Sequence, residues 1–381
     1  MLSRTILALA LLLDHGAASA QLYMGNEQSE ALRKEGEAFE QQDQLKEAMA
    51  RYAAAFAADR KASLPVARMA YLYLRLSQAA QDGKAEAYRG EASKAALTAI
   101  NIDENNTLAM EVLRQLDDPQ PQARYQPGKA SHAAMQEGEA LFHAKKYPEA
   151  IAQYQQALAL DPRNVDAIVY LGDCYFAQGD YLKAEKIFLQ ATQAEPLLGI
   201  AWRFLFDTQM RLSKLKDAET SALGAIAARP SELPSWLRMG QLHAAWGQKL
   251  ARLRLVPRAR LVAGTRNIEM DTDQETPDSA AWLAYAMAQA TESIKPGKAS
   301  PFEQELAAWT TAVLIIQELG TAARLKDVGL RQMIKFHEAG QLKAALFALR
   351  YREAWRPDFE AWKKAEPDGL KKFIDTFHIG P

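Results

Sequence analysis

Apolar residues recur three and four positions apart through most of this chain, which is the spacing of one face of an amphipathic α-helix. Residues 167–196 show the pattern most clearly, with two apolar faces that Gly179 and Asp180 separate. The apolar positions are Ile168, Leu171, Tyr175, Tyr181, Ile187, Phe188 and Ala191. Pro196 follows, and proline ends a helix because it lacks the backbone N–H and clashes with the preceding turn. The pattern therefore predicts a pair of helices of defined length.

This two-helix pattern repeats every 34 residues across residues 131–230. Each copy has one landmark in the first helix, three in the second helix and a closing proline. The three sets are Gly138, Ala150, Tyr154, Ala157 and Pro162; Gly172, Ala184, Phe188, Ala191 and Pro196; and Phe206, Ala218, Ala222, Ala225 and Pro230. We expect Gly172 to face Ala184, where the two helices cross closely. A single pair cannot bury its apolar face, so neighbouring pairs are expected to stack.

The period and its landmarks resemble the tetratricopeptide repeat (TPR). The resemblance implies an all-α fold, a right-handed superhelical solenoid of TPR-like helical hairpins. It is most specific over residues 131–230 and continues in divergent copies on both sides. The upstream copy has Leu32, Gly36, Phe39, Leu45, Ala48, Tyr52 and Ala55, with Arg60 in place of proline. Downstream copies have Trp236, Met239 and Gly240, and later Phe336, Gly340, Leu342, Ala345, Leu349 and Pro357.

Helix-breaking residues divide the chain into parts with different expected structures. We predict a signal peptide (1–20), divergent TPR-like hairpins (21–118), a Pro-rich linker (119–130), the central TPR array (131–248), a charge-sorted irregular insertion (249–278), and C-terminal helical hairpins with a divergent TPR and a cap (279–381). A fixed extended crossing is the alternative for the Pro-rich segment. Further helices are expected over residues 65–80, 85–100, 108–116, 279–293, 303–319 and 322–338, with a capping stretch over 358–377.

The first twenty residues have the order of a secretory signal. Arg4 precedes an apolar run over residues 6–13, and Ala18, Ser19 and Ala20 supply the small residues before a cleavage point. The apolar run is far shorter than the roughly 20 residues needed to span a bilayer. The sequence therefore predicts an exported protein, periplasmic or secreted, without an integral membrane segment once the signal is removed.

Composition and motifs narrow the functional classes. The chain has 46 basic and 47 acidic residues, whereas nucleic-acid binding usually requires a basic excess. The sequence has no Gly-rich phosphate loop, no paired histidines with metalloprotease spacing and a single cysteine, Cys174. We therefore predict no catalytic residues, no cofactor and no metal site. A scaffold or assembly factor is the favoured class, and an enzyme or envelope-processing factor with its site after residue 250 is the alternative.

In the TPR family the first helix of each pair lines the concave groove, and the resemblance carries this arrangement to the present chain. The groove residues it implies are Met135, Glu139, Phe142, His143, Val169, Asp173, Phe176, Arg203, Asp207 and Met210. Phe142 and Phe176 are expected side by side on this wall, outside the core and without a structural role. The mixture of apolar and acidic residues suits a protein or peptide partner, as an apolar helix or an extended segment with some positive charge. For each residue, packing against neighbouring helices is the alternative role.

Charge is sorted in the region after the central array. Residues 249–266 contain six basic residues and no acid, and residues 267–278 contain five acids and no base. The residues are Lys249, Arg252, Arg254, Arg258, Arg260 and Arg266, then Glu269, Asp271, Asp273, Glu275 and Asp278. Either the segment docks an acidic partner, or its two halves neutralise each other or remain solvated.

Overall fold

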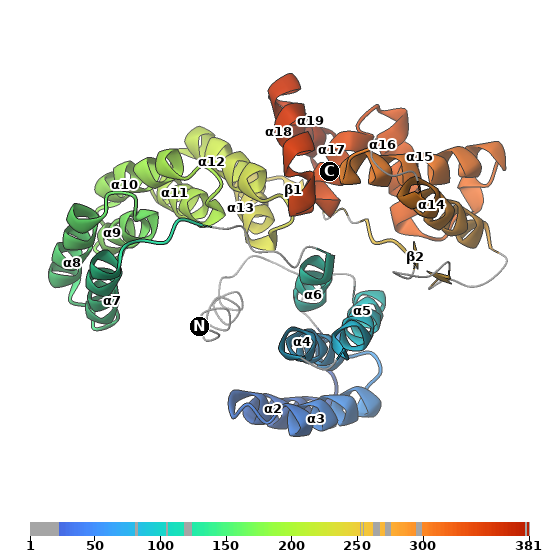
Figure 1. The fold of residues 1–381 in the computed structure, drawn as a ribbon, viewed down its shortest axis with the longest axis horizontal. Helices are drawn as coiled ribbons and strands as arrows, with labels where there is room; N and C mark the ends of the chain where they lie inside the picture. The colour runs from blue at the N-terminus through green and yellow to red at the C-terminus, as the bar shows by residue number, and fades with distance from the viewer. Residues whose placement is uncertain are drawn as a thin grey trace. The chain divides into compact units, whose positions relative to one another are not determined.

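A computed structural model describes residues 23–80, 83–103, 106–117, 124–251, 253, 255–261, 267–270, 276–294, 299–377 and 379–380. The predicted signal peptide lies outside these residues, as do much of the predicted linker and six of the eleven sorted charges. The chain forms two compact units, residues 1–121 and 122–381. The division falls within the segment over which the sequence predicts a linker. Each unit has its own helices and core (Figure 1).

The first unit contains two helical hairpins and a single following helix. Its helices are α2 (Glu27–Gln41), α3 (Leu45–Ala58), α4 (Ser63–Ala79), α5 (Ala85–Ile102) and α6 (Thr107–Asp117). α2 packs on α3, α4 packs on α5, and α6 contacts both helices of the second hairpin. The Asn106 side chain accepts a hydrogen bond from the Ala109 N–H at the start of α6 and donates one to Ser63 at the start of α4. This buried pair fixes α6 on the hairpin before it.

The second unit begins with the central array. Its helices are α7 (Lys129–His143), α8 (Tyr147–Leu160), α9 (Val165–Ala177), α10 (Tyr181–Ala194), α11 (Gly199–Arg211), α12 (Leu215–Ala228) and α13 (Leu233–Ala245). The hairpins are α7–α8, α9–α10 and α11–α12, and the first helices also contact one another in order. Figure 1 shows α7, α9, α11 and α13 on the inner side of the curve and α8, α10 and α12 outside. The structure is thus an all-α repeat solenoid, as the sequence predicts.

The turn between the two helices of each hairpin is fixed by one residue with a positive φ. Lys145, Gly179 and Ser213 have φ values of 59°, 79° and 59° in the three hairpins, and Gly247, in the turn after α13, has a φ of 74°. They lie 34 residues apart, so the left-handed turn recurs with the repeat. Glycine adopts this conformation without strain, whereas a residue with a Cβ does so at a cost. Two of the four turns therefore carry a strained residue.

Close helix crossing within each hairpin depends on a small residue opposite an aromatic ring. A methyl group added at Gly172 would lie 2.6 Å from the Phe188 ring, and one at Gly138 would lie 2.6 Å from the Tyr154 ring. The expectation that Gly172 faces Ala184 is wrong in its partner, because the ring one turn further along the second helix fills the space. The third hairpin reverses the sizes, with Phe206 in the first helix and Ala222 in the second, both buried.

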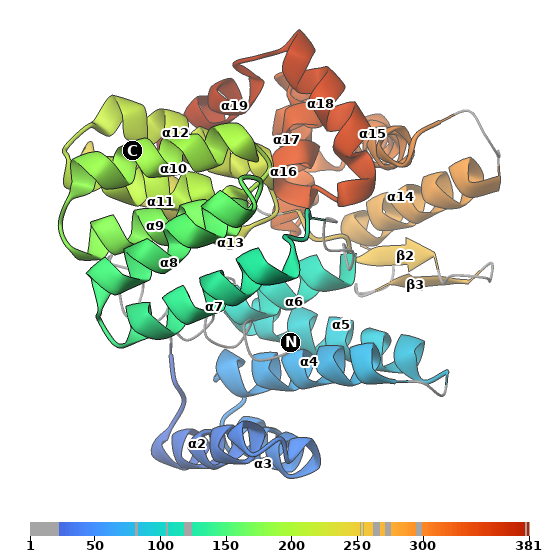
Figure 2. The same cartoon turned by 60° about the vertical axis from the view of Figure 1, so that its left-hand side comes forward.

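The rest of the second unit packs onto the end of the array. Its elements are β1 (Lys249–Leu250), β2 (Ala259–Leu261), β3 (Ile268–Met270), α14 (Pro277–Ile294), α15 (Pro301–Glu318), η2 (Ala322–Arg324), α16 (Val328–Glu338), α17 (Leu342–Arg350), η3 (Glu353–Trp355), α18 (Arg356–Ala365), α19 (Gly369–Phe377) and β4 (Ile379–Gly380). β1 pairs antiparallel with β4, and β2 with β3. Figure 2 shows the β2–β3 hairpin beside α14. One core joins α11–α13 to these helices.

Two expectations for this region are wrong in detail, and a third becomes more specific. The 249–278 insertion is not wholly irregular, because short strands form at 249–250, 259–261 and 268–270. The helix expected over 322–338 is interrupted: the Asp278 carboxylate accepts hydrogen bonds from the Lys326 and Asp327 N–H groups and so satisfies the backbone outside a helix. The capping stretch over 358–377 is two helices, separated at Pro367, which cannot continue a helix.

Candidate functional site on the inner wall of the array

The ten residues assigned to the groove lie on three successive first helices. Helical spacing of three and four residues places those of one helix along one face. α7 carries Met135, Glu139, Phe142 and His143; α9 carries Val169, Asp173 and Phe176; α11 carries Arg203, Asp207 and Met210. We call this surface the inner wall. The structure brings these helices into contact in order, but the ten side chains do not share one role.

Two of the assigned residues belong to the core. Met135 is 2% exposed and packs in the cluster between the first and second hairpins, and Val169 is 4% exposed in the next cluster. Each points between neighbouring hairpins, because a first helix has to bury one side against the adjacent repeat. Packing, the alternative that the sequence leaves open for each residue, is therefore their role.

Phe142 and Phe176 are half-buried aromatic residues at equivalent positions of successive repeats. The Phe142 ring meets the Tyr147 ring edge to face with centroids 5.5 Å apart, and the Phe176 ring meets the Tyr181 ring in the same way at 5.2 Å. Each tyrosine is the first residue of the second helix, so each ring pair closes a turn. The expectation that these phenylalanines have no structural role is wrong. Met210, at the third equivalent position, packs against the core that joins α11–α13 to the C-terminal helices.

Two charged side chains of α11 are paired with residues at the start of α13 and within it. Arg203 donates to Glu232 at 2.6 Å, and Asp207 accepts two hydrogen bonds from Arg238, at 2.7 and 3.2 Å. These pairs are bidentate or partly buried, which is the geometry in which ion pairs contribute most. The end of the inner wall near α13 is therefore closed by internal ion pairs.

Asp173, in the middle of the inner wall, differs from these charges. Across the described ranges no hydrogen bond or ion pair forms at its carboxylate. Burial raises the pKa of the Asp173 carboxyl from 3.8 to about 6, because the charged form loses hydration that no partner replaces. A carboxylate in this state binds a cation favourably. Sequence spacing alone placed Asp173 on the wall, but only the packing around it reveals its burial.

Tyr154 is a second polar group near Asp173 that lacks a partner. Its side chain is fully buried, and its hydroxyl makes no hydrogen bond to any described residue. Burial raises the pKa of this hydroxyl, and the nearby carboxylates of Glu139 and Asp173 raise it further. The equivalent Tyr52 in the first unit donates to Glu40 at 2.7 Å. Two polar side chains without a hydrogen-bond partner among the described residues thus lie on the consecutive helices α8 and α9.

His143 is exposed at the end of α7. Cys174, behind the wall, is fully buried, and burial raises the pKa of its thiol to about 12. Such a thiol is protonated and unreactive at neutral pH. No group of three or more His, Cys, Asp or Glu side chains in the described part of the chain is placed to hold a metal ion.

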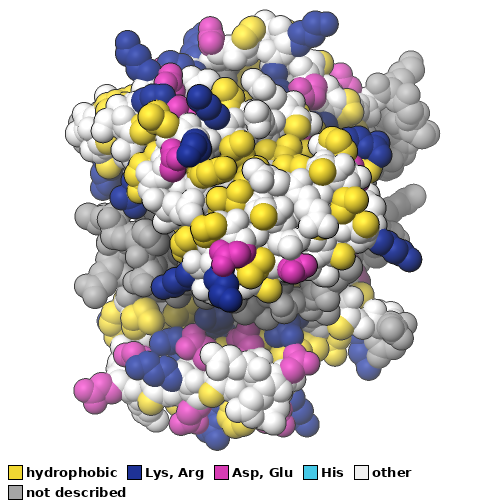
Figure 3. Space-filling view, turned by 90° about the vertical axis from the view of Figure 1, so that its left-hand side faces the viewer, with side chains coloured by type: hydrophobic (Ala, Val, Ile, Leu, Met, Phe, Trp, Pro, Cys, Tyr) yellow, Lys and Arg dark blue, Asp and Glu magenta, His cyan; other side chains and the backbone are white. Residues whose placement is uncertain are grey.

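The outer side of the array has a different surface. Exposed large apolar residues on the second helices include Leu160, Leu182 and Leu189. Figure 3 shows hydrophobic side chains gathered where the central array faces the viewer, with many charged side chains towards the margins. Isolated exposed leucines are common on protein surfaces. They supply useful reference positions for tests of the inner wall.

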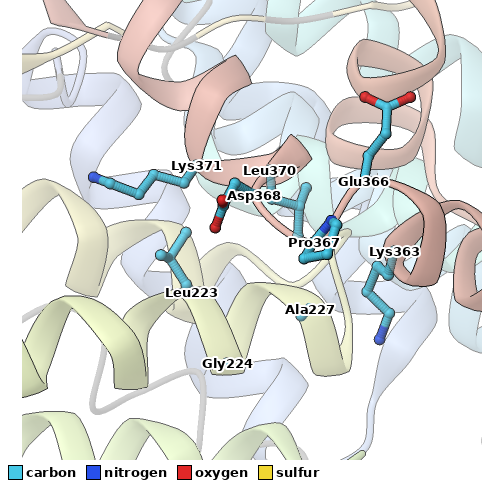
Figure 4. A pocket seen from close by; sticks show the side chains of 9 residues that line it. All are labelled: Leu223, Gly224, Ala227, Lys363, Glu366, Pro367, Asp368, Leu370 and Lys371. Carbon is cyan, nitrogen blue, oxygen red and sulfur yellow. The ribbon is translucent and has the colours of Figure 1, made fainter.

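A pocket of about 200 Å³ lies where α12 meets α18 and α19. Its lining residues are Leu223, Gly224, Ala227, Lys363, Glu366, Pro367, Asp368, Leu370 and Lys371 (Figure 4). Lys371 pairs with Glu219 of α12 and with Asp375 of α19. The Arg356 guanidinium also donates to the Ala228 carbonyl at 2.8 Å. These contacts fasten the C-terminal helices to the array, so we assign the pocket to their junction.

Comparison with known proteins gives one family match and similarities to parts of several proteins. Residues 141–205 match the family profile of the tetratricopeptide repeat. Human Superkiller complex protein 3 is 27% identical over 116 residues, which are 30% of this chain and 7% of that protein. The Sgt2 TPR domain from Aspergillus fumigatus is 24% identical, with 32% of this chain and 82% of that chain covered and a TM-score of 0.31. pilF of Pseudomonas aeruginosa is 15% identical, with 58% of this chain and 86% of that chain covered and a TM-score of 0.27.

The profile match and the 34-residue hairpins show that the central array consists of tetratricopeptide-type repeats. Repeats of this family generally act as protein–protein interaction modules, and the fold suggests a scaffold of that kind. None of the described helices combines the length and apolar character needed to cross a bilayer.

Proposed function

We propose that this protein is an exported, non-catalytic scaffold or assembly factor that holds segments of partner proteins against the inner wall of its central array. One observation carries the proposal: Asp173 is a partly buried carboxylate without a partner among the described residues. It shares α9 with the half-buried Phe176, and the half-buried Phe142 holds the position equivalent to Phe176 on α7. Buried charges without partners are costly, and proteins retain them mainly where a ligand provides compensation.

The partner chemistry follows from these side chains. A lysine or arginine of the bound segment would neutralise Asp173, and apolar residues beside it would cover the exposed parts of the two phenylalanine rings. Arg203 and Asp207, towards the other end of the wall, are already paired within the array. A helix or an extended segment that is apolar with one basic residue meets these conditions.

Export rests on the signal-type sequence of residues 1–20. Mass spectrometry of the exported protein should give Gln21 as its first residue. Recovery of the uncleaved chain from the membrane fraction would contradict this part of the proposal, without bearing on the inner wall.

The inner wall is tested by capture of partners from the native envelope with the parent protein, Asp173→Asn and a control, Asp217→Asn. Asparagine has nearly the same shape as aspartate but is uncharged and carries an NH2 donor in place of one carboxylate oxygen. Asp217 is an exposed acid in the first turn of α12, on the outer side of the array. We expect recovery of a stoichiometric partner to fall at least tenfold for Asp173→Asn, which corresponds to about 1.4 kcal/mol. The control should capture as the parent does, and equal capture by Asp173→Asn would refute this use of the wall.

A further inference from the structure

Residues 124–128, directly before α7, bind to the array without forming a helix or strand (Figure 1). We call these residues the strap. The Tyr125 hydroxyl donates to the Asp161 carboxylate at 2.8 Å, and the Gly128 N–H donates to the same carboxylate at 3.1 Å. The Arg163 guanidinium donates to the Tyr125 hydroxyl at 2.6 Å and lies 4.1 Å from the centroid of its ring. The strap is therefore held at the end of α8.

Arg124 reaches past the first hairpin to the second. Its Nε and Nη2 atoms donate to the two carboxylate oxygens of Glu195, at 2.8 and 3.0 Å, and Nη2 also donates to Asp166 at 2.9 Å. Asp166 lies in the first turn of α9, and Glu195 follows the end of α10. Arginine matches carboxylates in this two-pronged geometry, which gives directional recognition as well as charge. One guanidinium thus bridges both ends of the α9–α10 hairpin.

The first unit contains a copy of the tyrosine contact but not of the arginine contact. Tyr23 donates to Asp59 at 2.8 Å, as Tyr125 does to Asp161, and both residues of the second pair lie 102 positions after the first, three times 34. At the same offset from Asp166 stands Leu64. The tyrosine contact therefore recurs as part of the structure at the start of a hairpin. The arginine contact is an addition that hairpin construction does not require.

The two carboxylates remain in place without the strap, because rigid helices carry them. Both accept hydrogen bonds from the same Nη2 atom, so their oxygens lie within about 6 Å of each other. Without Arg124 two like charges would face each other, which is unfavourable until a cation binds. The Arg124 side chain is 31% exposed, so the guanidinium lies at the surface, where an external group can replace it.

We propose that Asp166 and Glu195 form an arginine-binding site that the chain fills with its own Arg124, and that an arginine in an extended segment of a partner protein takes this place when the strap leaves. This site lies at the edge of the array and does not depend on ligand binding at Asp173. A tethered segment acts at an effective concentration on the order of millimolar. The bound strap therefore prevents weak external ligands from binding. An external arginine binds only if its affinity is higher than that of the strap or if the strap has already dissociated.

A peptide with the sequence of the strap is a suitable probe for this site. A fluorescently labelled peptide with the sequence of residues 121–130 is titrated into the full-length parent protein, Arg124→Ala and Arg124→Gln, and binding is followed by anisotropy. We expect both variants to bind the peptide at least tenfold more tightly than the parent, because the internal competitor has lost its guanidinium. Lys129→Ala removes a nearby exposed positive charge at the start of α7 and should behave as the parent does. Binding should weaken as salt increases.

Two further comparisons separate a site from a general charge effect. A peptide with alanine in place of its arginine should lose the gained affinity, and so should Arg124→Ala combined with Asp166→Asn and Glu195→Gln. Circular dichroism establishes that each variant is folded, and Arg124→Gln keeps the side-chain length if the alanine variant does not fold. Equal affinity of the parent and the folded Arg124 variants for the peptide would overturn the proposal. Equal binding of the two peptides by those variants would overturn it as well.

Discussion

At the scale of single residues, each hairpin of the array pairs a large side chain on one helix with a small one on the other. Which of the two helices carries the large side chain differs between hairpins. Gly172 leaves room for the Phe188 ring, and in the next hairpin Phe206 lies in the first helix while Ala222 lies in the second. The same total volume is placed on opposite sides of the crossing. Cores tolerate such exchanges when volume is conserved and lose stability when it is not.

Gly172→Phe should therefore destabilise the protein by about 1 to 3 kcal/mol, because two rings would compete for one space. Adding Phe188→Ala reproduces the arrangement of the third hairpin and should recover much of the loss. Urea unfolding of the parent, the two single variants and the double variant measures the coupling. Additive effects of the two substitutions would contradict the volume exchange.

Asp173 should limit stability at neutral pH. Its folded pKa of about 6 lies above the ordinary value of 3.8, so its contribution to stability is complete below pH 4 and is lost as pH rises through 6. Asp173→Asn should then be more stable than the parent by about 1 to 3 kcal/mol at pH 8 and nearly equal at pH 4. Urea unfolding at both pH values measures this. A loss of stability at pH 8 would show that the ionised carboxylate has a structural partner.

At the scale of elements, hairpin geometry is set by the recurring left-handed turn. Glycine occupies this position in the second hairpin and after α13, whereas Lys145 and Ser213 occupy it in the first and third hairpins. The strain at the latter two positions is local, because the neighbouring helices hold the backbone in place.

Ser213→Gly should increase stability by up to about 1 kcal/mol, since glycine adopts a φ of 59° without steric cost. Gly179→Ala should have the opposite effect at the equivalent turn. Thermal unfolding of both variants provides the measurement. If Ser213→Gly were less stable than the parent, the entropy of the unfolded chain would outweigh the relief of strain.

The periodic pattern predicted the helices and the 34-residue hairpins because both depend on residues close in sequence. It did not predict the interruption before α16, which depends on Asp278, 48 residues before Lys326. It placed Phe142 on the wall but not against Tyr147, and Asp173 on the wall but not buried. It expected a linker or a fixed extended crossing over this segment, but not the contact between Arg124 and Glu195, 71 residues away. These features depend on contacts between residues far apart in the sequence, which the local spacing of apolar residues does not predict.

At the scale of the whole molecule, the second unit is an array whose last hairpins share a core with the C-terminal helices. Phe347 lies in that core, stacked on Phe302 with ring centroids 4.0 Å apart and close to Phe359 and Trp362. The same core includes Phe206 of α11. The end of the array and the C-terminal helices should therefore lose structure together.

Phe347→Ala should cost about 3 to 5 kcal/mol, because it removes a fully buried ring. Hydrogen exchange followed by mass spectrometry should show lower protection in α12 and α13 as well as in α15–α19. The helices of the first unit, which have a separate core, should exchange as in the parent. Loss of protection confined to the C-terminal helices would contradict the shared core.

The central claim is that partners bind to the inner wall, and site-specific photo-crosslinking in cells that express the protein tests it most directly. A photoreactive amino acid replaces His143 or Ala177, exposed and equivalent residues at the ends of α7 and α9, or Leu182 or Leu189 on the outer helix α10. The account predicts that both inner positions crosslink to the same partner and that neither outer position does. Crosslinks to that partner from the outer positions alone would contradict it.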